Sequence, residues 1–189
     1  MAWINTIHET DATGDLAALY KRVGNPDGTV DNVMKVHALN PASLRAHFEL
    51  YVQAMHKPSP LSRAEREVVA TEVSRLNGCE YCLTHHNLGL IRILPPERHA
   101  AARALREGDH SGLTGRERAL VDCARKLTLT PFDMVESDVE ALRSAGLDDR
   151  AILDLAQCIG YINYVNRIVT GLGVELGAGE GEAGQWPDT

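Results

Sequence analysis

The sequence predicts an all-α protein, a single helical domain of about eight helices, on the strength of three observations. In one segment after another, apolar residues recur at intervals of three and four, the spacing that gathers them on one face of a helix. Several of these segments begin with Ser or Thr followed three residues later by Glu, the pattern of a capping box. No segment alternates between apolar and polar residues over a convincing length, so the strands of a Rossmann or thioredoxin fold are not expected.

The first half of the chain supplies five of the helices. Asn40 places an N-cap residue before Pro41 at the first helical position, and residues 62–65 form the first capping box. Asn77-Gly78 is a helix-stop signal, so Cys79 is expected at the start of the next helix. The expected helices cover residues 15–23, 31–39, 41–57, 63–76 and a segment from 79 onward.

The second half supplies the remaining helices. A helix over residues 97–106 follows two prolines, and residues 114–117 and 137–140 form two further capping boxes. The last and longest helix begins near Asp148 or Asp149. Its broad apolar stripe over residues 152–172 favours burial on more than one side, within the subunit or against a partner. The sequence thus predicts a helical domain and a mobile Gly-rich tail, residues 1–175 and 176–189.

The composition is that of a soluble globular domain. The chain has 189 residues, of which 44% are hydrophobic and 24% charged, close to the average for such domains. Its net charge of -7 argues against a nucleic-acid partner, which would need a basic face. No apolar run approaches the roughly 20 residues of a membrane helix, and the first residues lack the basic start and apolar stretch of a secretory signal. A cytoplasmic protein without membrane contact is therefore expected.

The four cysteines are unevenly placed. Cys123 and Cys158 stand alone among apolar neighbours and are expected to be small buried side chains. Cys79 and Cys82 form a C-x-x-C at a helix start, where Cβ atoms three residues apart lie roughly 5–6 Å from each other. This separation allows a disulfide after a small local adjustment. His86 lies on the same helical face, and an imidazole together with a helix N-terminus favours the thiolate form of a cysteine.

Glu67 is expected near His86, because the two residues lie at similar distances from the turn between their helices. It lies ten residues before Asn77, roughly 15 Å along its helix, and His86 lies eight residues after Gly78, roughly 12 Å along the next. If the two helices fold back on each other, Glu67 and His86 come level. A carboxylate that faces an imidazole, which in turn faces a thiol, forms a workable proton relay.

The spacing of these residues resembles the signature of the alkyl hydroperoxidase D-like proteins of the carboxymuconolactone decarboxylase superfamily. That signature is a Glu, twelve residues later C-x-x-C, and then a His after three more residues, as in Glu67, Cys79, Cys82 and His86. The sequence around this signature is similar to that of the peroxidase-related branch of the family. The resemblance covers most of residues 10 to 175. Further matching segments are Leu127-Thr128, Leu142-Arg143-x-x-Gly146-Leu147 and Asn163-x-x-Asn166-Arg167-Ile168.

The resemblance implies a helical bundle of the alkyl hydroperoxidase D-like type and a thiol peroxidase. In such an enzyme Cys82 is the peroxidatic thiol, Cys79 is the resolving thiol, and Glu67 with His86 forms the proton relay. The implied partners are a hydroperoxide substrate and an external dithiol or redox-protein reductant, with no flavin, haem or metal cofactor. The resemblance also implies a homo-oligomer, as a dimer, trimer or hexamer. Tyr81 departs from the family pattern, because the best-studied members carry a second histidine at this position.

The choice of attacking sulfur sets two effects against each other. As the first residue of the helix, Cys79 meets the unsatisfied backbone N–H groups, an effect worth about 0.3–1 kcal/mol when exposed. Cys82 lies one turn from His86, and a positioned base contributes on the order of 10²–10⁴ in rate. The larger effect predicts Cys82 as the nucleophile and Cys79 as the more accessible sulfur of the resulting disulfide.

Two other kinds of site remain as alternatives. A zinc protein would use Cys79, Cys82 and His86 as three ligands of a tetrahedral site, although the sequence offers no evident fourth ligand. An acid–base enzyme of the decarboxylase type, found elsewhere in the same superfamily, is the second alternative, although such chemistry does not need two thiols at disulfide spacing.

The remaining polar residues are expected to have structural or surface roles. His85 is expected to be solvated or packed, and Glu72 to be a solvated charge. The other histidines, His8, His37, His47, His56, His99 and His110, are expected at the surface. Asn163, Asn166 and Arg167 are expected to form hydrogen bonds to a neighbouring helix or across an interface.

Overall fold

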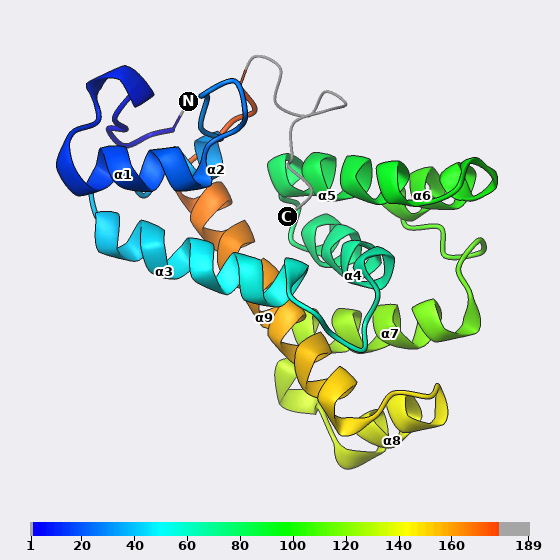
Figure 1. The fold of residues 1–189 in the computed structure, drawn as a ribbon. Helices are drawn as coiled ribbons and strands as arrows, with labels where there is room; N and C mark the ends of the chain where they lie inside the picture. Colours follow the sequence, from blue (N-terminus) through cyan, green and yellow to red (C-terminus); the bar gives the residue numbers. More distant parts are fainter. Residues whose placement is uncertain (1, 178–189) are drawn as a thin grey trace.

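The computed structural model describes residues 2–177, and within this range the chain is helical and contains no strand, which confirms the predicted fold class. Short 3₁₀ turns at Glu9–Asp11, Pro96–Arg98 and Pro131–Asp133 and a π-helical turn at Val52–His56 connect or extend the helices. The predicted tail lies outside the described residues from residue 178 onward. The nine α-helices of the described range (Figure 1) are α1 (Gly14–Val23), α2 (Asn32–Lys35), α3 (Pro41–Tyr51), α4 (Arg63–Leu76), α5 (Glu80–Ile93), α6 (His99–Arg106), α7 (Gly115–Leu129), α8 (Glu136–Ser144) and α9 (Asp149–Gly171).

Helix α4 is the centre of the bundle. It packs against α5, α6, α7 and α9, and its residues from Arg66 to Ser74 are all buried. Figure 1 shows α9 crossing the molecule beside it, with α1, α2 and α3 on one side and α5 and α6 on the other. Because α4 is buried almost all round, each of its charged side chains needs a partner from a neighbouring helix.

Local signals set most of the helix boundaries. The Ser62 hydroxyl accepts a hydrogen bond from the Glu65 backbone N–H while the Glu65 carboxylate accepts one from the Ser62 N–H, so this capping box is confirmed. The same pair of hydrogen bonds opens α7. The third predicted box, at residues 137–140, is wrong. Helix α8 begins earlier, and the Asp138 carboxylate accepts from the Val135 N–H at 2.8 Å, because an acidic side chain one turn into the helix reaches back to that free N–H.

The turn between α4 and α5 is what brings the cysteines into place. Gly78 has a φ of 63°, a left-handed conformation that glycine adopts without steric cost. The Cys79 N–H donates to the Ser74 carbonyl at 3.0 Å, which closes a Schellman-type end on α4. Helix α5 begins directly after this turn with Cys79 as its N-cap residue, as predicted, and packs along α4.

Glu72 corrects the expectation of a solvated charge. It is fully buried on α4, and Arg75 donates two hydrogen bonds to its carboxylate at 2.8 and 3.0 Å. Arg125 from α7 donates a third at 2.8 Å, and His110 lies 3.2 Å from the second carboxylate oxygen. Burial opposes ionisation, but these partners together hold the pKa of Glu72 below its usual value. The ion cluster ties α4 to α7 and to the connection that precedes it.

Apolar packing completes the bundle, with a main core around α3, α4 and α9 and a smaller one between α4, α5, α6 and α7. One face of α9 is buried along its length, from Ala151 to Val169. Of the predicted stripe, Ile152, Ile168 and Leu172 are half-buried and Ala156 is exposed. Within residues 2–177, no helix combines the length and the apolar character needed to cross a membrane.

Candidate active site

A pocket opens between α4, α5 and the helices that face them, and it contains three of the four residues predicted for the site. Glu67 from α4 and Cys82 and His86 from α5 line it, whereas Cys79 does not. The pocket encloses about 770 Å³, counting its open mouth. The other lining residues are Val33, Met34, His47, Tyr51, Arg63, Tyr81, His85, Gly89, Arg92, Ile93, Tyr161 and Val165.

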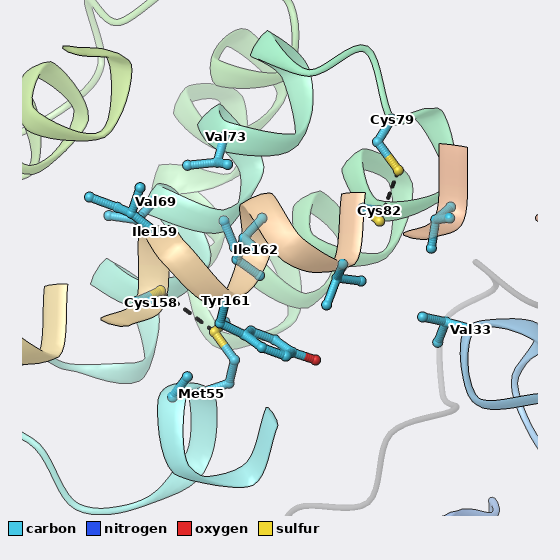
Figure 2. Close-up of a cluster of buried hydrophobic side chains, with 14 of the residues drawn as sticks. Val33, Met55, Val69, Val73, Cys79, Cys82, Cys158, Ile159, Tyr161 and Ile162 are labelled. Carbon is cyan, nitrogen blue, oxygen red and sulfur yellow. Dashed lines mark hydrogen bonds between the residues drawn. The ribbon is translucent and has the colours of Figure 1, made fainter. Parts of the chain in front are cut away.

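The two sulfurs of the C-x-x-C are in contact. Cys79 and Cys82 are both free thiols, both buried, and their Sγ atoms lie 2.9 Å apart. Figure 2 shows the sulfurs pointing toward each other at one edge of the buried apolar cluster that also contains Val69, Ile159 and Ile162. Since Cys82 lines the pocket and Cys79 lies behind it, a small molecule entering the pocket meets the Cys82 sulfur first.

The contact between the sulfurs makes the pair easier to ionise. The hydrogen bond from the Cys82 thiol lowers the pKa of Cys79 to about 7, with help from the Cys82 backbone N–H and the Thr170 hydroxyl and against the effect of burial. The same hydrogen bond, together with burial, raises the pKa of Cys82 well above its usual value, while Asn166 acts in the opposite direction. The first proton therefore leaves the pair readily. Both shifts favour the thiolate on Cys79 with the remaining proton on Cys82, so attack by Cys82 requires that proton to cross to Cys79 over the 2.9 Å contact.

Glu67 and His86 form the carboxylate–imidazole pair that their positions along α4 and α5 suggested. The His86 Nδ1 lies 2.8 Å from the Glu67 Oε2, and both side chains are largely buried. A carboxylate at this distance holds the proton on Nδ1 and leaves Nε2 of a neutral imidazole as an acceptor. Arg63, one turn before Glu67, approaches the other carboxylate oxygen at 3.8 Å, and Gly89 leaves the carboxylate uncovered by any side chain on that turn of α5.

Tyr81 and His85 form a ring pair on the first turns of α5. Their ring centroids are 4.5 Å apart, and both residues line the pocket. The Tyr81 hydroxyl accepts a hydrogen bond from the Val33 backbone N–H at 3.2 Å, so it ties α5 to the start of α2. Burial, with the nearby charges of His86 and Arg92, lowers the pKa of His85 to about 4, so its ring is neutral at neutral pH.

The asparagines of α9 support the turn that carries the cysteines. The Asn77 side chain donates to Asn163 at 3.0 Å and to Asn166 at 2.9 Å. The Asn166 amide in turn donates to the Ser74 hydroxyl at 3.2 Å. The hydrogen bonds from Asn77 fix the orientation of the Asn166 amide, so that its N–H groups face Ser74 and its carbonyl faces the turn. Since Asn77 directly precedes Gly78, this network anchors the C-x-x-C to α9.

The zinc alternative finds no support in the arrangement of the side chains. Among residues 2–177, no three His, Cys, Asp or Glu side chains are grouped as metal ligands would be. The two isolated cysteines are also unsuited to chemistry in the thiolate form. Burial raises the pKa of Cys123 to about 11 and that of Cys158 to about 12.

Sequence reasoning missed the aromatic and histidine side chains that α3 and α9 contribute to the pocket. His47, expected at the surface, is 3% exposed, and His37 is buried beside it. The signal was present: His47 lies three residues after Leu44 and four before Tyr51, on the apolar face of its helix. The burial of a histidine in an otherwise apolar stripe cannot be predicted from its sequence neighbours, because histidine is also common at protein surfaces.

Comparison with known proteins adds a family and several structures. The carboxymuconolactone decarboxylase family model matches residues 41–93. The chain is 30% identical to an uncharacterized peroxidase-related protein from Silicibacter sp. TM1040, covering 88% of this chain and 85% of that one with a TM-score of 0.77. It is 25% identical to an alkylhydroperoxidase AhpD core, an uncharacterized peroxidase-related protein from Ralstonia eutropha JMP134, covering 93% and 92% with a TM-score of 0.83. The debrominase Bmp8 is similar in fold alone, at 18% identity over 92% of this chain and 91% of that one, with a TM-score of 0.75.

Proposed function

This chain belongs to the carboxymuconolactone decarboxylase superfamily, in its alkyl hydroperoxidase D-like part, and from that membership we propose that it is a thiol peroxidase that reduces hydroperoxides. The fold does not select the reaction, because a debrominase shares it. The observation that carries the proposal is local: one pocket holds the Cys82 thiol and the Glu67–His86 pair, with a second thiol 2.9 Å behind the first.

The first step is attack on the peroxide. The cysteine pair loses one proton to the Glu67–His86 relay, Cys79 holds the remaining proton across the contact, and the Cys82 thiolate attacks the terminal oxygen of the hydroperoxide. An S–O bond forms as the O–O bond breaks, and the leaving alkoxide takes the proton from His86 and departs as an alcohol. Cys82 is now a sulfenic acid, oxidised by two electrons.

Cys79 resolves this intermediate. Its thiol attacks the Cys82 sulfur, an S–S bond forms, and the S–O bond breaks to release water that carries the Cys79 proton. An external dithiol or a redox protein then reduces the Cys79–Cys82 disulfide by thiol–disulfide exchange and leaves as its own disulfide. The cycle needs no other cofactor, and a supply of dithiol reductant fits the cytoplasmic location that we propose for the protein.

Steady-state consumption of cumene hydroperoxide, with dithiothreitol or a thioredoxin system as the reductant, tests this function. We expect turnover by the unmodified protein and by Cys123→Ser, and none by Cys82→Ser. Cys79→Ser is expected to reduce one equivalent of peroxide and then stop. Equal turnover by Cys82→Ser would contradict the proposal, and so would failure of the unmodified protein with every dithiol offered.

Self-association is the second part of the proposal. The end of α7 and its connection to α8 expose Leu129, Phe132 and Val135, with Phe132 82% exposed, so three large apolar side chains close in sequence meet solvent in one chain. Large exposed apolar patches mark interfaces between proteins, and we propose that these three side chains form part of one. Sedimentation at micromolar concentration is expected to give a species of at least twice 20.6 kDa, and Phe132→Glu is expected to weaken it. A monomer at that concentration would contradict the proposal.

A further inference from the structure

The pocket has a wall of ring side chains that the peroxidase cycle does not use. His47 and Tyr51 from α3 and Tyr161 from α9 line it, and Tyr81 and His85 add a ring pair from α5. Figure 2 shows the Tyr161 ring extending from α9 on the side of the core where Met55 and Val33 lie. The Tyr51 and Tyr161 rings lie 6.0 Å apart, within the range of aromatic packing. Hydrogen peroxide needs none of this apolar surface.

His47 is the unusual member of this wall. Its side chain is almost fully buried, and neither ring nitrogen has a hydrogen-bond partner among the described residues. The ring stacks on His37 at 4.6 Å and tilts against Tyr161 at 5.8 Å. Burial and the neighbouring His37 lower the pKa of His47 to about 3, so the ring is neutral at neutral pH. It therefore offers the pocket one N–H donor and one nitrogen acceptor.

Buried polar groups in folded proteins almost always have a hydrogen-bond partner, so a histidine that lacks one and lines a pocket indicates a ligand. We propose that this ring wall binds the organic part of the substrate, and that His47 hydrogen-bonds an uncharged hydroxyl or carbonyl group on it. Resting on the peroxidase function proposed above, this inference assigns the substrate to the aromatic hydroperoxides that carry a neutral polar group.

The charges of the pocket support an uncharged ligand at the wall. A carboxylate beside the neutral His47 would be desolvated without a countercharge, which is costly. The two cations of the pocket lie on other elements: Arg63 approaches the Glu67 carboxylate, and Arg92 is exposed near the end of α5. An anionic substrate would therefore be held by the arginines and would leave His47 unsatisfied.

A matched pair of hydroperoxides tests the inference. 4-Isopropylcumene hydroperoxide and its analogue with a hydroxyl on the isopropyl carbon differ by one hydroxyl group at nearly the same shape. Their product alcohols allow binding to be measured by ligand-observed NMR without any turnover. We expect the hydroxylated alcohol to bind about two- to tenfold more tightly than the other, the range for one neutral hydrogen bond. The oxidation rates at low peroxide are expected to show the same ratio.

Three variants locate the effect. His47→Phe keeps a ring for stacking and removes both nitrogens, so the preference is expected to vanish. His47→Gln keeps a donor and an acceptor and is expected to restore part of it. His37 stacks behind His47 and does not line the pocket, so His37→Phe is expected to leave the preference intact. Circular dichroism verifies that each variant is folded. If His47→Phe does not fold, the preference measured in His47→Gln still decides the test.

The outcomes separate this inference from the peroxidase proposal. An equal preference in the unmodified protein and His47→Phe would overturn the inference, and so would tighter binding of the 4-carboxyl analogue, which would place recognition at Arg63 and Arg92. If the binding preference depends on His47 but no hydroperoxide is consumed, the ligand site stands and the peroxidase function falls.

Discussion

Replacing Cys79 by alanine is expected to raise the pH at which Cys82 reacts. The Cys82 thiol is the main cause of the low pKa of about 7 at Cys79, from an ordinary value of 9.0, so the pair yields a thiolate near neutral pH. In the intact pair, the high pKa of Cys82 belongs to the loss of a second proton beside the Cys79 thiolate. Removing Cys79 removes that effect, but it also removes the sulfur that stabilises the first thiolate, and burial opposes ionisation of Cys82 alone. With the ordinary cysteine pKa of 9.0 as the reference, the difference from the pair is about 3 kcal/mol, at roughly 1.4 kcal/mol for each pH unit.

The rate at neutral pH follows from two opposed effects. A thiol with a pKa of 7 is half ionised at pH 7, whereas one with a pKa of 9 is about 1% ionised, which lowers the thiolate concentration about 50-fold. The more basic thiolate is intrinsically more nucleophilic, by about six- to tenfold for two pKa units at a Brønsted coefficient of about 0.4–0.5. The net rate of attack at pH 7 is therefore expected to fall about five- to eightfold in Cys79→Ala.

Stopped-flow oxidation by cumene hydroperoxide from pH 5 to pH 10, with peptide-resolved mass spectrometry, measures this profile. The midpoint is expected near pH 7 for the unmodified protein and at pH 9 or above for Cys79→Ala. Cys79→Ser keeps a hydroxyl donor beside the Cys82 sulfur and is expected to fall between them. A midpoint that stays near pH 7 in Cys79→Ala would refute the reasoning, because Cys82 would then owe its ionisation to Glu67 and His86 and not to its partner sulfur.

Three further substitutions test other parts of the account. Glu67→Gln removes the charge that orients His86, and we expect the rate of Cys82 oxidation at pH 7 to fall on the order of 10²-fold, the lower end for a positioned base; a loss below threefold would exclude the relay. Glu72→Gln leaves Arg75 and Arg125 without their carboxylate partner and is expected to cost about 1–3 kcal/mol of unfolding free energy in urea at pH 7, the range for losing hydrogen bonds to a charged group. Because the folded pKa of Glu72 lies below the unfolded value, its contribution is present above the unfolded pKa and is lost as the pH falls through the folded one, so the acid-side loss of stability should be shallower in Glu72→Gln and an unchanged slope would contradict this. Gly78→Ala forces a side chain into a left-handed residue and is expected to cost about 1–2 kcal/mol, whereas Gly115→Ala, in the first turn of α7, should not destabilise; equal effects would show that the turn is not constrained.

The fold could be predicted because its boundaries depend on short-range chemistry. A Ser or Thr cap with Glu three residues on fixes a helix start by two hydrogen bonds that involve only neighbours in the chain, as at Ser62 and Thr114. The start of α8 was misplaced because Asp138 and Ser137 both offer caps within one turn, and only packing decides between them. The approach of Glu67 to His86 followed from counting residues on either side of the Gly78 turn.

Two features of the molecule depend on long-range contacts and were not predicted. Glu72 lies among the apolar positions of α4, but its partners Arg125 and His110 come from segments 53 and 38 residues away. Without those partners in view, a carboxylate is read as solvated, because isolated charges do not enter cores. His47 faces the pocket for a similar reason: its burial depends on rings from α9 that the sequence alone does not place beside it.

The most direct test of the central claim is a single-turnover reaction of the fully reduced protein with one equivalent of cumene hydroperoxide. Rapid quenching with a thiol-blocking reagent, followed by peptide mapping, locates every oxidised sulfur, and chromatography counts the alcohol. We predict one cumyl alcohol and one Cys79–Cys82 disulfide per chain, with Cys123 and Cys158 reduced, and in Cys79→Ser a sulfenic acid on Cys82. Unconsumed hydroperoxide would contradict the account, as would rapid formation of a sulfenic acid on Cys79 in Cys82→Ser.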